Sequence, residues 1–187
     1  MTNYDEYFVR LRSRKRVGLW YRNLWLYPRI CKYLTGKVLD IGCGIGDMVR
    51  YRAGTVGVDV NPVAVAFCRS QGLQVQQMQA DRLPFTDGEF DGANLDNVLE
   101  HLASPELLLG EIHRVLRSGG RLVIGVPGEC GFASDPDHKR HYPEAELVRC
   151  LRGAGFELLH AFHEPFRSRL LDRSFRYYAL YGVFRPI

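Results

Sequence analysis

Three glycines at alternate positions follow a short apolar run in the stretch VLDIGCGIGD, residues 38–47. Gly42, Gly44 and Gly46 suit a strand that turns sharply around a ligand, because glycine lets the backbone approach closely and adopt left-handed conformations. A dinucleotide loop has the spacing GxGxxG, but here Asp47 occupies the place of the third glycine. A carboxylate at that turn disfavours a pyrophosphate, and no GK[ST] follows, so a P-loop is excluded.

Carboxylates stand after the next apolar runs, where a bound nucleoside would need them. Asp59 lies at the end of TVGVDV, where it could accept hydrogen bonds from both hydroxyls of a ribose. Asp81 lies in ADRLPF, where an acid and an apolar segment could bind the amine and the ring of adenine. The following run ends at Leu95 and Asp96. These residues predict a site for an adenosine-containing molecule.

Histidines are the candidates for proton transfer. His138 and His141 lie in a polar segment, residues 128–147, and His101 follows the run that ends at Asp96. An imidazole with its ordinary pKa of about 6.5 can take a proton from a hydroxyl group. The alternative is that these side chains only stabilise a long loop. The spacing of acids and histidines in 128–147 matches no standard metal motif, so we expect no metal ion.

From Lys37 onward, strand-like runs alternate with helix-like periodic segments. The predicted strands are 38–41, 55–60, 73–78, 90–95, 121–126, 156–164 and 176–186, and the predicted helices include 62–72, 104–120 and 143–155. In the helix over 104–120, Ser104 is the expected N-cap and Gly119-Gly120 the expected end. Repeated strand–helix–strand units form right-handed crossovers. We therefore expect an α/β fold with a seven-stranded, mostly parallel, doubly wound sheet.

Length and composition fit one globular domain. The chain has 187 residues, of which 46% are hydrophobic and 25% charged. It has no apolar run of about 20 residues that could span a bilayer, and its start lacks the apolar core of a signal peptide. Five scattered cysteines without a CxxC pair favour reduced thiols. These features predict a cytoplasmic protein.

The net charge of +4 is unevenly distributed. Residues 1–37 carry nine Lys/Arg and two acidic residues, and residues 165–187 carry five Lys/Arg and one acidic residue. Residues 38–164, by contrast, carry 11 Lys/Arg and 18 acidic residues. The basic ends either meet an anionic partner or keep the protein soluble. The aromatic N-terminal segment, predicted to be partly helical with a break near Tyr27-Pro28, could be a lid or a membrane-surface helix. Nucleic acid is disfavoured, because the core is acidic and no binding module is appended.

The chain resembles the class I S-adenosylmethionine-dependent methyltransferases, in particular the type 11 group. Four stretches carry the resemblance in the family's order, between about 37 and 127: VLDIGCGIG, VGVDVNPVAV, QADRLPFTDGEFDGANLDNVLEHL and EIHRVLRSGGRLVIGVP. The resemblance implies a Rossmann-like sheet with an antiparallel last strand, and S-adenosylmethionine as cofactor with S-adenosylhomocysteine as product. It also implies a single methyltransferase domain over 1–187, with an N-terminal lid or substrate segment (1–36), a cofactor core (37–127) and an acceptor side (128–187).

The resemblance further assigns residues to parts of the cofactor. The glycine loop, with Asp40, Gly42, Cys43, Gly44 and Gly46, would surround the methionine part and the ribose. Asp59 and Val60, at the end of the second strand, would bind the ribose. Adenine would be contacted by Asp81, Arg82 and Leu83, and the far side of the cofactor would be lined by Leu95 and Asp96. Only 13 positions separate Gly46 from Asp59, so the helix between them should have about two turns.

We therefore expect a methyltransferase for a small-molecule, saccharide or lipid-linked acceptor, acting at oxygen rather than nitrogen. The stretch from His138 to Tyr142 resembles an H-x-R-x-Y/F segment of type 11 relatives that modify saccharides or lipids. Arginines at 167, 169, 173 and 176 would suit an anionic acceptor. The alternatives are a catalytically inactive cofactor-binding module that serves a partner, and an NAD-dependent oxidoreductase.

Overall fold

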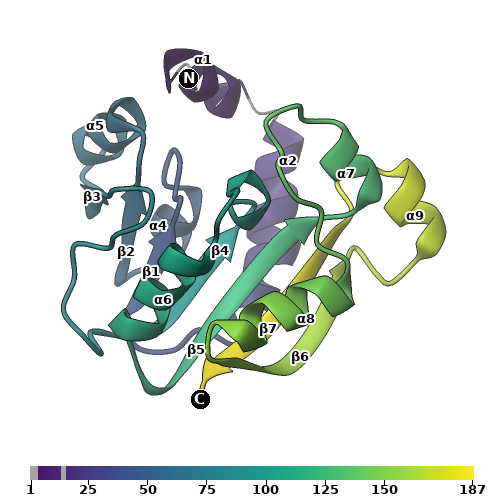
Figure 1. Ribbon diagram of the computed structural model, residues 1–187. Coiled ribbons are helices and arrows are strands. Elements are labelled where there is room, and N and C mark those ends of the chain that lie inside the picture. The colour runs from purple at the N-terminus through teal and green to yellow at the C-terminus, as the bar shows by residue number, and fades with distance from the viewer. Residues whose placement is uncertain (1–3, 14–15) are drawn as a thin grey trace.

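The computed structural model describes residues 4–13 and 16–187 of the chain. A seven-stranded sheet lies at its centre, in the order β3-β2-β1-β4-β5-β7-β6 (Figure 1). The strands are β1 (Val38–Ile41), β2 (Thr55–Asp59), β3 (Val75–Gln77), β4 (Phe90–Asp96), β5 (Leu116–Pro127), β6 (Phe156–Glu164) and β7 (Ala179–Pro186). The last strand, β7, pairs antiparallel with both β5 and β6, and all other neighbours are parallel. The predicted α/β sheet with an antiparallel last strand is confirmed.

Helices pack on both faces of the sheet. They are α1 (Tyr4–Arg12), α2 (Arg16–Tyr21), the π-helix η1 (Arg22–Leu26), α3 (Tyr27–Cys31), α4 (Asp47–Tyr51), α5 (Pro62–Ser70), the 3-10 helix η2 (Leu99–His101), α6 (Glu106–Val115), α7 (Glu129–Ala133), α8 (Glu144–Gly153) and α9 (Arg169–Ser174). Figure 1 shows α6 and α8 in front of the sheet and α2 behind it. None of the helices in the described part of the chain has the length and hydropathy of a membrane span.

Alternating residues of the sheet face two separate apolar cores. Leu39 belongs to the core under α6 and α8, which contribute Ile112 and Leu151. Its neighbour Val38 belongs to the core on the other face, together with Ile30 of α3. Side chains alternate along a strand, so a buried strand such as β1 needs apolar residues at successive positions. This explains why the central strands read as continuous apolar runs.

Three sequence-based predictions about helices are wrong. The helix expected over 104–120 is shorter: Pro105 is its N-cap, without a side-chain cap, and it ends at Val115. Leu116 already pairs with Phe90 of β4, and the register shifts before the next pair, Gly92 with Arg121. Residues 117–120, which include two glycines, therefore form an irregularity at the start of β5 and not a last helical turn.

The helix expected to break at Pro28 continues through it. Helical turns run without interruption from α2 through η1 into α3, and Pro28 stands in the first turn of α3. Proline lacks an N–H donor, and the wider π-turn just before it accommodates that loss. The prediction of an interruption near Tyr27-Pro28 is therefore wrong. The helix after the glycine loop, α4, has five residues and is shorter than the predicted two turns.

Candidate cofactor and acceptor site

The glycine loop folds back over the end of β2. Gly42, Gly44 and Gly46 have φ of +71°, +54° and +78°, the left-handed region that favours glycine. A Cβ on Gly42 would lie 2.4 Å from Cγ2 of Val98, so the loop touches the segment after β4. The N–H of Gly42 donates to the carbonyl of Val58 at 2.8 Å. The loop thus makes the sharp turn that its spacing predicts, at the edge where β1, β2 and β4 end.

Asp59 lies beside this loop, held by backbone N–H groups. Its Oδ2 accepts from Gly44 at 2.7 Å and its Oδ1 from Asn61 at 2.8 Å, and only 5% of the residue is exposed. Burial raises the pKa of Asp59, and the backbone donors oppose that rise. A carboxylate has about four lone-pair positions. The carboxylate therefore retains acceptor capacity for a hydroxyl group of a bound ribose.

Asp40 lies within the sheet beneath the loop. Its Oδ1 accepts from Nδ2 of Asn94 on β4 at 2.7 Å, and the side chain is buried. Burial raises the pKa of Asp40 to about 7. Cys43 is also buried, and it packs with Cys68 and Val49 in a small core below the loop. In this structure Cys43 is a packing residue of the loop.

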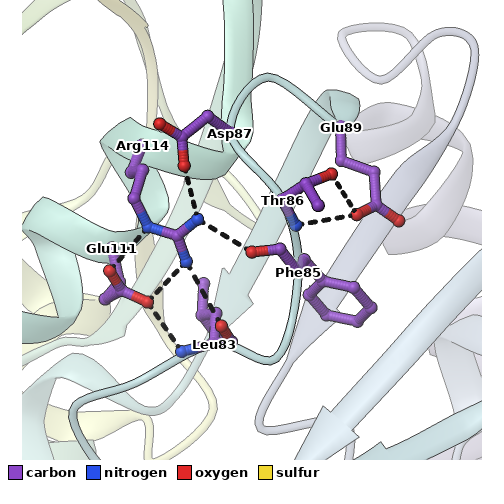
Figure 2. A network of polar contacts seen from close by, with 7 residues as sticks. All are labelled: Leu83, Phe85, Thr86, Asp87, Glu89, Glu111 and Arg114. Carbon is purple, nitrogen blue, oxygen red and sulfur yellow. Dashed lines mark hydrogen bonds and ion pairs between the residues drawn. The ribbon is translucent and has the colours of Figure 1, made fainter.

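The predicted adenine segment is anchored by α6. Leu83 is buried, whereas Asp81 and Arg82 are exposed. The N–H of Leu83 donates to Oε2 of Glu111 at 2.9 Å, and Arg114 donates to the carbonyl of Leu83 at 3.2 Å. Figure 2 shows this guanidinium between Glu111, Asp87 and the carbonyls of Leu83 and Phe85. Glu111 lies on the same helix as Arg114, and the other three contacts tie the loop to α6.

A hollow of about 810 Å³ opens beside this network, lined by Gln76, Arg82, Leu83, Pro84, Phe85, Thr86, Glu89, Glu111 and Arg114. Its lining includes neither the glycines of the loop nor Asp59. The hollow therefore adjoins the predicted adenine residues Arg82 and Leu83 but not the glycine loop or the predicted ribose acid.

Asp96, at the end of β4, meets side chains from two distant segments. Its Oδ1 accepts from the hydroxyl of Tyr181 on β7 at 2.7 Å and from Nδ2 of Asn97 at 2.9 Å. Arg22 of η1 brings Nη1 to 4.0 Å from Oδ2. Leu95 is fully buried in the core below. Sequence reasoning missed Arg22 and Tyr181, because neither belongs to a motif.

The segment after Asp96 places Glu100, His101 and His138 together. The rings of His101 and His138 lie 4.7 Å apart, centroid to centroid. Nε2 of His138 is 3.9 Å from Oε1 of Glu100. Glu100 is 1% exposed, and neither carboxylate oxygen has a hydrogen-bond partner. Burial raises the pKa of this carboxyl to about 8. Two of the three predicted histidines are thus brought together with an acid that sequence reasoning did not assign.

His141 does not join this cluster. The centroid of its ring lies 5.2 Å from that of Phe132. Phe132 also contacts the ring of His138, at a centroid distance of 5.4 Å. Tyr142 is buried in the main core. Of the arginines predicted to attract an anion, Arg167 pairs with Glu144 at 3.3 Å and Arg173 pairs with Glu129 at 3.4 Å. Those two guanidinium groups are already matched by acids.

The N-terminal helix lies across the glycine loop. Figure 1 shows α1 above the upper edge of the sheet, next to α5. Nδ2 of Asn61 donates to the carbonyl of Tyr4 at 3.0 Å, and the rings of Phe8 and Phe67 meet edge-on at 5.5 Å. Leu11 is buried, with Cδ1 3.0 Å from where a Cβ on Gly44 would stand. The helix therefore covers the loop.

Comparison with known proteins places the chain in a family. A family model described as a methyltransferase domain matches residues 39–124. The Mycobacterium tuberculosis protein named "Probable S-adenosylmethionine-dependent methyltransferase Rv3030" is 33% identical over 175 residues, which are 84% of this chain and 63% of the relative. The chain is a class I S-adenosylmethionine-dependent methyltransferase. Its cofactor is accordingly S-adenosylmethionine, which argues against the NAD-dependent alternative.

Two further comparisons concern this methyltransferase. The O-methyltransferase resE of Aspergillus sclerotiorum is 30% identical over 145 residues, covering 65% of this chain and 55% of the relative. The methyltransferase of Haloferax volcanii, solved in complex with the activator Trm112, superposes with a TM-score of 0.76 at 20% identity, covering 100% and 98% of the two chains. That identity supports the fold alone. This methyltransferase spans less than two thirds of the length of the Mycobacterium tuberculosis and Aspergillus sclerotiorum relatives.

Proposed function

We propose that this methyltransferase transfers the methyl group to an oxygen atom of a small, saccharide or lipid-linked acceptor that lies against His101 and His138. The observation that carries the proposal is the contact between Val98 and Gly42, which brings the segment before Glu100 against the cofactor loop. On this proposal the paired histidines border the cofactor site. The O-methyltransferase among the relatives supports oxygen as the acceptor atom.

The cofactor is proposed to follow the edge of the sheet. The glycine loop and Asp40 would surround its methionine part, and Asp59 with Val60 would bind the ribose. Leu83 offers a buried apolar contact for adenine, with Asp81 and Arg82 exposed beside it. Asp96 would line the opposite side, where Tyr181 and Asn97 hold its carboxylate.

Methyl transfer from a sulfonium ion is an in-line displacement that depends on orientation above all. The acceptor oxygen forms a bond to the methyl carbon, the carbon–sulfur bond breaks, and its electron pair remains on sulfur, which yields S-adenosylhomocysteine. An alcohol must lose its proton during this step. The histidine pair is suited to promote that ionisation. Burial, and after it the neighbouring His138 ring, lowers the pKa of His101, which favours its neutral form.

The helix α1 is proposed to act as a lid over the cofactor. It covers Gly44 through Leu11 and reaches Asn61 through the carbonyl of Tyr4. A lid excludes water from the reacting atoms. The next helical segment is fixed separately, because Tyr21 and Trp25 both donate to Oε2 of Glu164 at 2.8 Å. Because Tyr21 and Trp25 stay bound to Glu164, α1 can move without disturbing the segment proposed to face the acceptor.

The test is calorimetric titration followed by a labelled-methyl transfer assay. We expect the protein to bind S-adenosylhomocysteine and not NAD. Among alcohols, phenols, carboxylic acids and amines of comparable size, label should pass to oxygen acceptors. His138→Gln should reduce this transfer, with S-adenosylhomocysteine affinity retained. Binding without transfer to any acceptor would favour the inactive cofactor-binding module, and transfer confined to amines would refute oxygen as the acceptor.

A further inference from the structure

The cluster of Glu100, His101 and His138 has the composition of a metal site. Among the residues that the structure describes, these three each offer one ligand atom, and the three atoms lie within 4.8 Å of one another. In a metal site with ligand bonds of about 2.0–2.2 Å, ligand atoms stand about 3 Å apart. The closest measured pair, Nε2 of His138 and Oε1 of Glu100, is at 3.9 Å. Binding one ion would require these atoms to move closer by about 1–2 Å.

Glu100 is the strongest single observation. It is 1% exposed, and both of its carboxylate oxygens lack a hydrogen-bond partner. Buried carboxylates are normally paired, hydrogen-bonded or bound to metal ions, because an uncompensated buried polar group is costly. Its backbone carbonyl accepts from the N–H groups of Lys139 and Arg140 at 2.7 and 3.2 Å. These bonds hold the histidine-bearing segment against Glu100 through the backbone, leaving the carboxylate unpaired.

His138 is oriented in the way a metal ligand requires. Its Nδ1 lies 2.9 Å from the carbonyl of Phe132, to which it donates, and its ring stacks on the Phe132 ring at 5.4 Å. That hydrogen bond places the proton on Nδ1 and leaves the lone pair of Nε2 directed toward Glu100. A ligating histidine commonly donates its other ring N–H to a backbone carbonyl in this manner.

From these contacts we infer that Glu100, His101 and His138 bind one divalent transition-metal ion, and that this ion coordinates the methyl acceptor through two neighbouring oxygen atoms. Two imidazoles and one carboxylate suit Zn²⁺, Mn²⁺ or Fe²⁺. Three protein ligands leave two or three coordination positions open in a five- or six-coordinate ion. An acceptor with vicinal hydroxyls, or with a hydroxyl beside a carboxylate or carbonyl, fills two of them.

The part of this inference that concerns the acceptor rests on the proposed function. A hydroxyl bound to the ion becomes more acidic and releases its proton to solvent. The resulting alkoxide forms the oxygen–carbon bond as the carbon–sulfur bond breaks. The ion-binding part stands on the geometry of the three side chains alone. The metal-free expectation from sequence considered only the spacing within 128–147, where two of the three ligands are absent.

Calorimetric titration of the chelator-treated 187-residue chain with Zn²⁺ and with Mn²⁺ tests the site, and the electron paramagnetic resonance spectrum of Mn²⁺ gives a readout independent of activity. We expect one ion per chain. Glu100→Gln, His101→Gln and His138→Gln should each weaken binding by about 10-fold or more. His160→Gln is the matched control, because His160 is exposed on β6 and lies beside Tyr33. It should bind the ion as the unaltered protein does.

Absence of binding, or equal binding by the unaltered protein and His138→Gln, would overturn the inference and favour a plain Glu100–His138 proton pair. If Glu100→Gln does not fold, the two histidine variants decide the matter, and the ion should raise the Tm of the unaltered protein but not theirs. S-adenosylhomocysteine is titrated in chelator on the same samples. Cofactor binding without ion binding would refute only the metal site. Ion binding without transfer to any oxygen acceptor would refute the proposed function and the acceptor part of this inference, but not the metal site.

Discussion

The upper edge of the sheet is built in two different ways. The cofactor half, comprising the ends of β1 and β2 with the loop between them, holds the carboxylate of Asp59 through the backbone N–H groups of Gly44 and Asn61. The proposed acceptor half, comprising η1, η2, α7, the ends of β4 and β6 and the start of β7, is assembled from side chains. There Trp25 meets Glu164 across 139 positions and Tyr181 meets Asp96 across 85.

This difference separates what tolerates substitution from what does not. A site formed by backbone groups depends on a few glycines and on one carboxylate that accepts hydrogen bonds from backbone N–H groups. Side chains of the loop that make no such contact can vary. A site made of side chains can be altered one contact at a time, so acceptor specificity can change while the cofactor site remains intact. Four substitutions test the contrast, and they are taken from the largest expected effect to the smallest.

Gly42→Ala should have the largest effect. The new Cβ would lie 2.4 Å from Val98 at a φ of +71°, so we expect a loss of about 3 kcal/mol in the free energy of unfolding and no measurable S-adenosylhomocysteine binding. Urea unfolding and calorimetry measure both. Gly110→Ala is the control, because a Cβ there meets nothing within 4 Å inside α6. It should leave binding unchanged and stabilise the protein by up to about 1 kcal/mol. Equal outcomes for the two variants would contradict the assignment of the loop.

Glu164→Ala should destabilise the acceptor half alone. It removes the acceptor for Tyr21 and Trp25 and the partner of Arg29, whose Nη1 is 2.8 Å from Oε1. Because Arg29 is partly exposed, we expect the free energy of unfolding to fall by about 2 kcal/mol, less than for a fully buried ion pair. Trp25 fluorescence and limited proteolysis within 16–31 report the release of the segment. S-adenosylhomocysteine affinity should persist; its loss would show that the two halves are not independent.

The matched control for this substitution is Glu157→Ala. Glu157 is an exposed acid on the same strand, paired with Arg185 at 2.6 Å. Surface pairs of this kind contribute about 0.2–1 kcal/mol. Proteolysis within 16–31 should therefore be the same as in the unaltered protein.

Asp59→Ala should weaken S-adenosylhomocysteine binding by about 10- to 100-fold, the cost of losing charge-assisted hydrogen bonds to the ribose. The measurement is calorimetric titration, with circular dichroism to verify the fold. Asp81→Ala, which removes an exposed carboxylate of the same edge, should cost less than 10-fold. An unchanged affinity in Asp59→Ala would refute the ribose assignment.

Asp40→Asn should change the pH dependence of stability. The pKa of Asp40 rises from 3.8 to about 7 in the folded state, so the native protein retains a proton that the unfolded chain releases between those values. Its free energy of unfolding therefore falls as pH rises through that window and stays low above it. Asparagine does not titrate and can still accept from Asn94. Between about pH 4 and pH 8 the variant should gain on the order of 1 kcal/mol over the unaltered protein. Parallel urea-unfolding profiles would contradict this.

Local patterns predicted much of the fold. The strands 38–41 and 156–164 have the predicted bounds, and α5 begins at the predicted Pro62. Two of the helix errors have different causes. Leu116 is extended because it pairs with Phe90, which is distant in sequence. Pro28 stays helical because the π-helix η1 directly precedes α3, and nothing in the composition of residues 22–26 signals a π-helix.

The amino-acid sequence by itself determined the cofactor half of this methyltransferase. Its residues are neighbours along the chain, and parallel strands bring their carboxyl ends to one edge without further instruction. Only the tertiary structure decided the acceptor half. Glu100 gains its meaning from burial beside His138, and burial depends on how α7 and the chain after it return across the sheet. Desolvation and side-chain distance are properties of the folded chain, and spacing along the sequence does not contain them.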